Sequence, residues 1–290
     1  MDKCAPGKDF EEGSCFTKKE LTTITLALNK NIDSNINIKQ EKKELVKDLE
    51  KKFKKEYDCD NQQCWLSQKF MKNIGNDDIS KYTFRPNGPS GKHSWLSTTN
   101  INEVIEQYEK NNDDFMYLGT VPYDFEDLKD LGIKDLNLKK INNDGINKIG
   151  MVINLDYHYQ GGSHWVALYT DLKKNQIYFF DSFAKKPKKK IKQFINRLTK
   201  YLYKNNFDSN LNINNVIKKL EGGGTNSQIK NLSKFDIRFN NIQHQFKNSE
   251  CGVYSINFII RLAKGESFDN ITKNITKDDD MNLCREVYFN

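Results

Sequence analysis

The stretch that most constrains the fold is an apolar run that begins at a cysteine. After the polar residues 248–250, Cys251 and Gly252 open a segment whose apolar side chains cover most of a helical surface: Val253, Ile256, Phe258, Ile259, Ile260 and Leu262. Such a helix has to pack inside a domain, which holds its first residue still. A helix N-terminus also favours thiolate over thiol through its free N–H groups and its dipole. The sequence therefore predicts a buried helix with a nucleophilic cysteine at its start.

Strand-like runs precede this helix. Residues 151–155 are nearly all apolar, as in a strand covered on both faces. Residues 164–169 and 177–181 are two further runs, and the polar turn 171–175 between them predicts an antiparallel hairpin. A long helix is expected over 191–202 and a strand over 235–239.

The first eighty or so residues are predicted to be helical. A capping-box pattern, Thr17 to Glu20, opens one amphipathic helix, and apolar residues at spacing four mark a second over 45–53. The turn-rich segment 85–91 is the predicted boundary. We therefore expect a helical N-terminal arm domain over 1–85 and a second domain over 86–290. In the second domain, helices are expected near 101–108 and 281–287, and a short one within 125–138.

The cysteine content argues against a disulfide scaffold. Six cysteines in 290 residues are too few for one, no apolar run approaches membrane length, and the N-terminus lacks a signal-peptide pattern. We therefore expect a reducing, cytosol-like compartment, no membrane association and unbridged cysteines. A zinc site could be built from Cys4, Cys15, Cys59 and Cys64, but buried or incidental thiols are the preferred interpretation. No metal or other cofactor is expected.

The charge is positive but mostly dispersed. The net charge is +7, and the dense basic run is confined to 185–190. A solvated loop before a helix is the preferred interpretation of this run, and weak DNA association is the alternative.

Thiol chemistry on a carbonyl needs a base, a group that orients the base, and donors for the oxyanion. The chain offers His164 at a strand start, Asp181 at the end of the next strand, and Gln245 six positions before Cys251. If the two strands pair, the imidazole and the carboxylate meet at one edge of the sheet. Taken singly, each residue has an ordinary structural interpretation, and only the combination favours catalysis.

Other candidates are set aside. His158 lacks an adjacent tryptophan, His93 and His244 lack a carboxylate at a comparable strand end, and Cys284 fits a packing role. Gly161-Gly162 and Gly222-Gly223-Gly224 resemble Gly-Gly cleavage sites, and self-processing at the second is an alternative. A flexible loop over the glycine-rich segment 221–226 is preferred.

The combination resembles the catalytic signature of the ubiquitin-like-protein (SUMO) protease clan. The matching motifs are His164-Trp165, Phe180-Asp181-Ser182 and Gln245 to Cys251-Gly252, within about 150–262, with Trp95-Leu96 as a further similarity. Within the clan, the chain is most similar to the polyprotein-processing proteases of African swine fever virus and other large DNA viruses. That likeness extends to the segments 15–19, 59–64, 244–245 and 275–281. At the third catalytic position the swine fever enzyme has Asn where this chain has Asp181.

The resemblance implies an α+β, papain-like core with a central mixed sheet flanked by helices, preceded by the helical arm. It implies a cysteine endopeptidase with Cys251, His164, Asp181 and Gln245 in the catalytic roles. Trp165 and Trp95 would then bind the substrate, a viral structural polyprotein cleaved after Gly-Gly during virion maturation. The implied location is the virion and the host cytoplasm.

Two other functions remain open. One is a deconjugating isopeptidase that acts on SUMO or another ubiquitin-like modifier with the same four residues. The other is a catalytically inactive binding or scaffold protein.

Overall fold

A computed structural model describes residues 3–74, 77–206 and 235–290, and it divides the chain into two units. The arm unit comprises Met1–Gly88 and Glu286–Asn290, and the sheet unit comprises Pro89–Arg285. The predicted division into 1–85 and 86–290 did not anticipate that the last five residues join the first unit. They do so because the backbone N–H of Asn290 donates to Pro86 O at 3.0 Å and its side chain accepts from the backbone of Lys3 at 2.7 Å.

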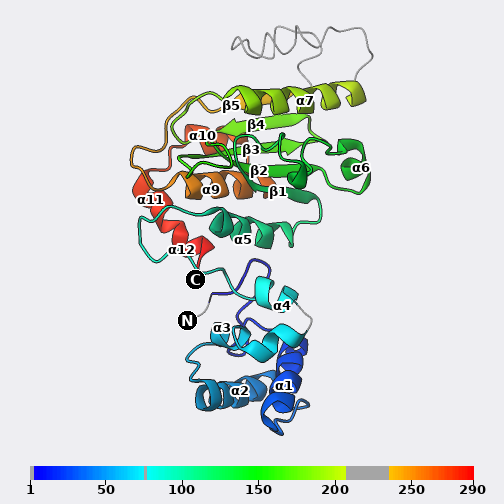
Figure 1. Ribbon diagram of the computed structural model, residues 1–290, viewed down its shortest axis with the longest axis vertical. Helices are drawn as coiled ribbons and strands as arrows, with labels where there is room; N and C mark the ends of the chain where they lie inside the picture. The colour runs from blue at the N-terminus through cyan, green and yellow to red at the C-terminus, as the bar shows by residue number, and fades with distance from the viewer. Residues whose placement is uncertain (1–2, 75–76, 207–234) are drawn as a thin grey trace. The chain divides into compact units, whose positions relative to one another are not determined.

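The arm unit is helical, as predicted. Its elements are α1 (Lys18–Ile32), α2 (Lys42–Tyr57), α3 (Gln62–Leu66), the 3-10 helix η1 (Lys69–Ile74) and α4 (Asp77–Tyr82) (Figure 1). The expected capping box is present: Thr17 accepts from the backbone of Glu20, whose carboxylate accepts from the backbone of Thr17.

An aromatic stack fills the arm core. The Trp65 ring stacks with Phe53, at 4.8 Å between centroids, and with Phe16, at 6.0 Å. All three rings are at most 1% exposed. The short helix α3 therefore brings its tryptophan against Phe53 of α2 and against Phe16, which lies just before α1.

The expectation of unbridged cysteines is wrong for the arm. Cys4 is bonded to Cys15 and Cys59 to Cys64, with Cα–Cα distances of 5.3 and 5.5 Å. These distances lie in the usual range for a disulfide. The prediction rested on the compartment inferred from the N-terminus, and sequence spacing cannot show which cysteines the helices bring together. With the four thiols bonded in pairs, the zinc alternative is also ruled out.

The sheet unit is built on a five-stranded mixed sheet in the order β1-β2-β3-β4-β5. The strands are β1 (Phe115–Val121), β2 (Lys148–Asn154), β3 (Trp165–Asp171), β4 (Gln176–Phe180) and β5 (Asp236–Phe239). β1 is parallel to β2 and β4 to β5, whereas β2, β3 and β4 are antiparallel. The predicted hairpin of β3 and β4 and the strand at 235–239 are confirmed. β1 was missed.

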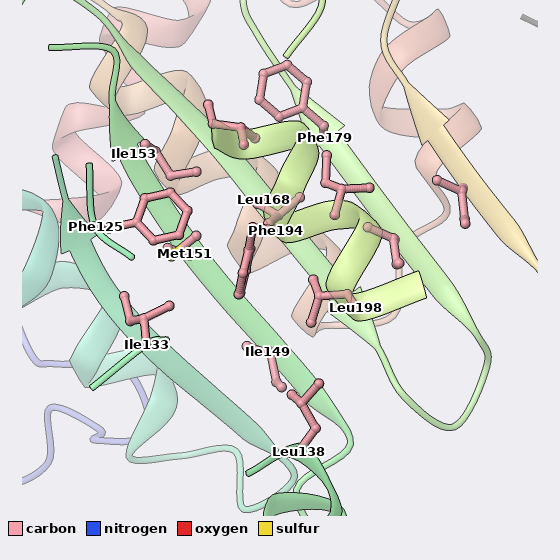
Figure 2. Close-up of a cluster of buried hydrophobic side chains, with 14 of the residues drawn as sticks. Phe125, Ile133, Leu138, Ile149, Met151, Ile153, Leu168, Phe179, Phe194 and Leu198 are labelled. Atoms are coloured by element: carbon pink, nitrogen blue, oxygen red, sulfur yellow. The ribbon is translucent and has the colours of Figure 1, made fainter. Parts of the chain in front are cut away.

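Helices cover both faces of the sheet. α7 (Lys189–Asn206) lies on one face, where Phe194 and Leu198 pack with Met151 and Phe179 in one buried cluster (Figures 1 and 2). α9 (Cys251–Ala263) and α5 (Thr98–Glu109) lie on the other face. There the ring of Phe258 stacks on Phe180, with 4.8 Å between centroids. This double coverage explains why β2 and β3 are apolar almost throughout.

The remaining elements are short. The segment 125–138 contains the 3-10 helix η2 (Lys129–Leu131), and α6 (Leu138–Asn143) follows. The chain ends with α10 (Phe268–Lys273), α11 (Asp278–Leu283) and α12 (Arg285–Tyr288). The glycine-rich segment 221–226, considered above as a cleavage site, lies outside the described residues.

Candidate active site

Cys251 is the first residue of α9, and its free thiol is buried, with 3% of the residue exposed. Almost every residue of α9 is buried, so the helix start is fixed by packing on the sheet. Gly252 makes room for a neighbouring segment, because a Cβ there would lie only 3.1 Å from Cβ of Leu96. The predicted setting, a cysteine at the N-terminus of a buried helix, is confirmed.

His164 immediately precedes β3 and faces the end of β4. Its ring Nε2 lies 2.7 Å from Oδ1 of Asp181, and its side chain is 11% exposed. Its backbone carbonyl accepts from Leu155 N at 2.9 Å, which holds the chain before the strand. The hairpin thus brings together two residues that are seventeen positions apart.

Asp181 is itself held in place. It is 1% exposed, and Oδ1 also accepts from the backbone N–H of Phe183 at 2.8 Å. Asn240, just after β5, accepts from Asp181 N at 2.9 Å and donates to Asp181 O at 2.8 Å. The sequence analysis missed Asn240, because the contact spans 59 positions and depends on the pairing of β4 with β5.

The ionisation of His164 depends on both of its partners. Burial alone would lower the pKa, but hydrogen bonds to Asp181 and Cys251, and their negative charge, raise the pKa of His164 to about 9. Since Nε2 faces Asp181, Nδ1 is the ring nitrogen left for the sulfur. The imidazole therefore lies between the carboxylate and the thiol and carries a proton at neutral pH.

Gln245 is fully buried and its amide is fixed at both ends. Ser182 Oγ donates to Oε1 at 2.6 Å, and Nε2 donates to Lys247 O at 2.7 Å. The backbone N–H of Gln245 donates to Ser182 O at 2.9 Å. An amide nitrogen carries two hydrogens, so Nε2 keeps a second one besides that given to Lys247. Ser182 was noticed as part of a motif, but its role as the anchor of Gln245 was not.

The two tryptophans differ in exposure. Trp165 is 8% exposed and its Nε1 donates to Leu96 O at 3.0 Å. Trp95, next to Leu96, is 50% exposed. Trp165 therefore anchors the segment that carries Trp95, and the Trp95 side chain is the one that a ligand can reach more easily.

A second histidine–carboxylate pair is separate from the group of His164, Asp181 and Cys251. His158 Nδ1 lies 2.6 Å from Oδ2 of the buried Asp124, and His158 is half-exposed. The sequence analysis set His158 aside without noticing this partner. The two free thiols of the chain are Cys251 and Cys284, and the His164 pair is the one whose pKa responds to Cys251.

Two further features are absent from the described residues. No cluster of His, Cys, Asp and Glu there could hold a metal ion. Within the same residues, no helix has the length and apolar character needed to cross a membrane.

Comparison with known proteins shows the family of the chain. The model of the Ulp1 protease family, C-terminal catalytic domain, matches residues 136–289. A thiol protease of Acanthamoeba polyphaga mimivirus is 33% identical, over 100% of this chain and 93% of its own length. A cysteine protease of African swine fever virus is 24% identical, over 87% of this chain and 89% of its own length.

A solved structure supports the fold. The crystal structure of a protease from African swine fever virus superposes with a TM-score of 0.60 at 20% identity, covering 89% of this chain and 93% of that chain. The family model and the viral relatives define a cysteine protease. The chain belongs to the Ulp1 protease family.

Proposed function

We propose that this chain is a thiol endopeptidase in which Cys251, His164 and Asp181 form the catalytic triad. The observation that carries the proposal is the imidazole of His164, whose Nε2 lies 2.7 Å from Asp181 Oδ1 and whose pKa is raised by both Asp181 and Cys251. Such an imidazolium stabilises a thiolate and keeps a proton for the leaving group. Asp181 fixes the ring orientation.

The reaction proceeds in two halves. The Cys251 sulfur attacks the scissile carbonyl and forms a C–S bond, and the C–N bond breaks as His164 gives its proton to the leaving amine. Water then attacks the thioester, with His164 as base, and releases the carboxylate product and the thiol. In both halves the oxyanion accepts from the backbone N–H of Cys251 and from the second hydrogen of Gln245 Nε2.

The proposed substrate is a polypeptide cleaved after Gly-Gly. Leu96 lies against Gly252 and is tied to Trp165, so the segment that carries Trp95 runs beside the start of α9. A passage between Trp95 and Trp165 would admit a backbone without side chains, which is the property of glycine.

We further propose a viral structural polyprotein as the natural substrate, with virion maturation as the setting and the virion and host cytoplasm as the locations. The support is the extent of the similarity to two viral proteases: it covers the arm as well as the sheet unit, whereas the family model begins at residue 136.

Family membership favours a second candidate, an isopeptidase that removes SUMO or a related modifier. Both substrate classes present a Gly-Gly carbonyl, so the same triad would serve. Incubation with a Gly-Gly polyprotein and with modifier conjugates separates the two. Faster cleavage of the conjugate would replace the polyprotein proposal.

Weak DNA association through the basic run 185–190 is a further part of the proposal. Two of its lysines are already engaged within the protein, Lys188 with Leu155 O and Lys190 with Asp127. Binding should therefore be weak and should fall steeply with salt.

The direct test is Cys251→Ala with a Gly-Gly peptide. We expect cleavage to fall by at least about 10³-fold, because the nucleophile is lost. Cys284→Ala, which removes the other free thiol, is the matched control and should cleave at the parent rate. Cleavage by Cys251→Ala at the parent rate would overturn the proposal and leave the inactive binding protein as the better interpretation.

A further inference from the structure

The residue directly before the nucleophile is a buried carboxylate. The Glu250 side chain is 2% exposed, and its Oε2 lies 2.8 Å from Nε of Arg285, which is 11% exposed. Its Oε1 accepts from Asn282 Nδ2 at 3.0 Å and from Ser249 Oγ at 2.8 Å. Both carboxylate oxygens are thus held by partners from α11, α12 and the turn itself.

The same partners hold a second segment. Arg285 Nη2 donates to Ser94 O at 2.8 Å, and Asn282 Nδ2 donates to Lys92 O at 2.7 Å. These carbonyls lie just before Trp95 in the chain. On the other side of Trp95, Leu96 is fixed by Trp165 and Gly252, as described above. The half-exposed Trp95 ring therefore projects from backbone that is anchored on both sides.

Stability alone does not explain this arrangement. Glu250 is the N-cap residue of α9, but its side chain makes no capping hydrogen bond. A buried ion pair is often no more stabilising than apolar residues of the same size. What the pair supplies is a fixed geometry.

We propose that Glu250 is a positioning residue of the active site, which, together with Arg285 and Asn282, fixes the turn that carries Cys251 and the segment that carries Trp95. This role rests on the proposed protease function, and it makes Glu250 a residue that determines how efficiently the protein cleaves its substrate. Displacement of Cys251 lowers kcat, and displacement of Trp95 raises KM. A misplacement near 1 Å lowers rates on the order of 100-fold.

The experiment compares Glu250→Gln, Arg285→Met and the double variant in the full chain. Each single change leaves a buried group without its charged partner, so the thermal midpoint and kcat/KM should both fall. The double variant should recover the thermal midpoint, while its kcat/KM stays about 10- to 100-fold below that of the parent. Recovery of kcat/KM to the parent value would overturn the proposal.

Arg285→Lys gives a second test that does not depend on that recovery. Lysine keeps the charge but lacks the planar fork that reaches Glu250 and Ser94 O together. We expect a stable protein with kcat/KM lowered about 10-fold, chiefly through KM. Cleavage by this variant with the parent KM and kcat would overturn the proposal.

The matched control is the Arg261–Glu266 pair at the other end of α9, with 2.6 Å between Nη2 and Oε1. Arg261→Gln combined with Glu266→Gln should leave kcat/KM within about twofold of the parent. The rate at which iodoacetamide alkylates Cys251 does not depend on a contact with Trp95. This rate therefore reports movement of the turn that carries Cys251, separately from movement of the tryptophan. A parent that neither cleaves nor labels would overturn the proposed function as well. If the parent and the double variant cleave equally well, the positioning role of Glu250 is overturned but the proposed protease function is not.

Discussion

The arm unit and the sheet unit are stabilised in different ways. In the arm, four cysteines form two disulfides around an aromatic core. Its buried polar residues, among those described, are uncharged: Ser14, Thr25, Gln62 and Thr83. The sheet unit keeps both free cysteines, and its described part buries five acidic residues: Asp124, Asp171, Asp181, Glu250 and Asp278.

The arm unit is thus stabilised by disulfides and apolar packing, whereas the sheet unit also contains buried carboxylates that neighbouring groups hold in place. A buried carboxylate is costly unless it has partners, and for two of these five residues the partners are groups that the proposed reaction uses or fixes. Asp181 pairs with His164, and Glu250 pairs with Arg285. We therefore expect substitutions of these polar groups to change cleavage, and substitutions of the arm disulfides to change stability.

The largest effect outside the triad is expected at Gln245. Gln245→Ala removes an oxyanion donor and should lower kcat on the order of 10²- to 10³-fold, as measured with a Gly-Gly peptide. Gln245→Glu keeps the shape but replaces the donor by an acceptor, so it should lose a similar amount. A Gln245→Glu enzyme with the parent kcat would show that this residue does not bind the oxyanion.

The next effect concerns Asp181 and pH. Because His164 has to protonate the leaving amine, kcat/KM of the parent should fall above about pH 9, where the ring loses its proton. Asp181→Asn removes the charge that raises the pKa of His164 but keeps an oxygen that can accept from the ring. The alkaline limb should therefore move to lower pH, with a smaller loss at neutral pH than in Asp181→Ala. An unchanged alkaline limb in Asp181→Asn would contradict the assigned role.

The smallest effect on cleavage is expected in the arm. Replacing Cys59 and Cys64 by serine should lower the free energy of unfolding by about 2 kcal/mol, since the disulfide no longer restricts the unfolded chain. Cleavage of a short peptide should stay within about twofold of the parent. Thermal unfolding and peptide assays on the same sample check both expectations. If the serine variant keeps its fold but no longer cleaves the peptide, the proposed division of roles between the two units is contradicted.

The sequence predicted those parts of the site that depend on local pattern. A polar turn between two apolar runs predicted the β3–β4 hairpin, and the hairpin brings His164 to Asp181. An apolar run after Cys251 predicted the buried helix. These signals lie within a few residues of the groups that they position, so no knowledge of the tertiary fold was needed.

The parts of the fold and the site that were not predicted depend on contacts between residues far apart in the sequence, which residue spacing does not reveal. Asn240 reaches Asp181 because β5 pairs with β4, and Arg285 reaches Glu250 because α12 follows α11 back to the start of α9. β1 was missed because Gly119 and Thr120 interrupt its apolar pattern, and the register shifts between Tyr117 and Thr120. The disulfides were missed because the compartment argument took no account of geometry.

The central claim is that the imidazole of His164 holds the sulfur of Cys251 ready for attack. The most direct test compares the rate of iodoacetamide labelling at Cys251 at pH 6 between the parent and His164→Ala, with mass spectrometry as the readout. Burial raises the pKa of Cys284, so that thiol should label slowly in both proteins and serves as the internal control. We predict fast labelling of Cys251 in the parent and labelling at least about 10-fold slower in His164→Ala. Equal rates in the two proteins would contradict the account.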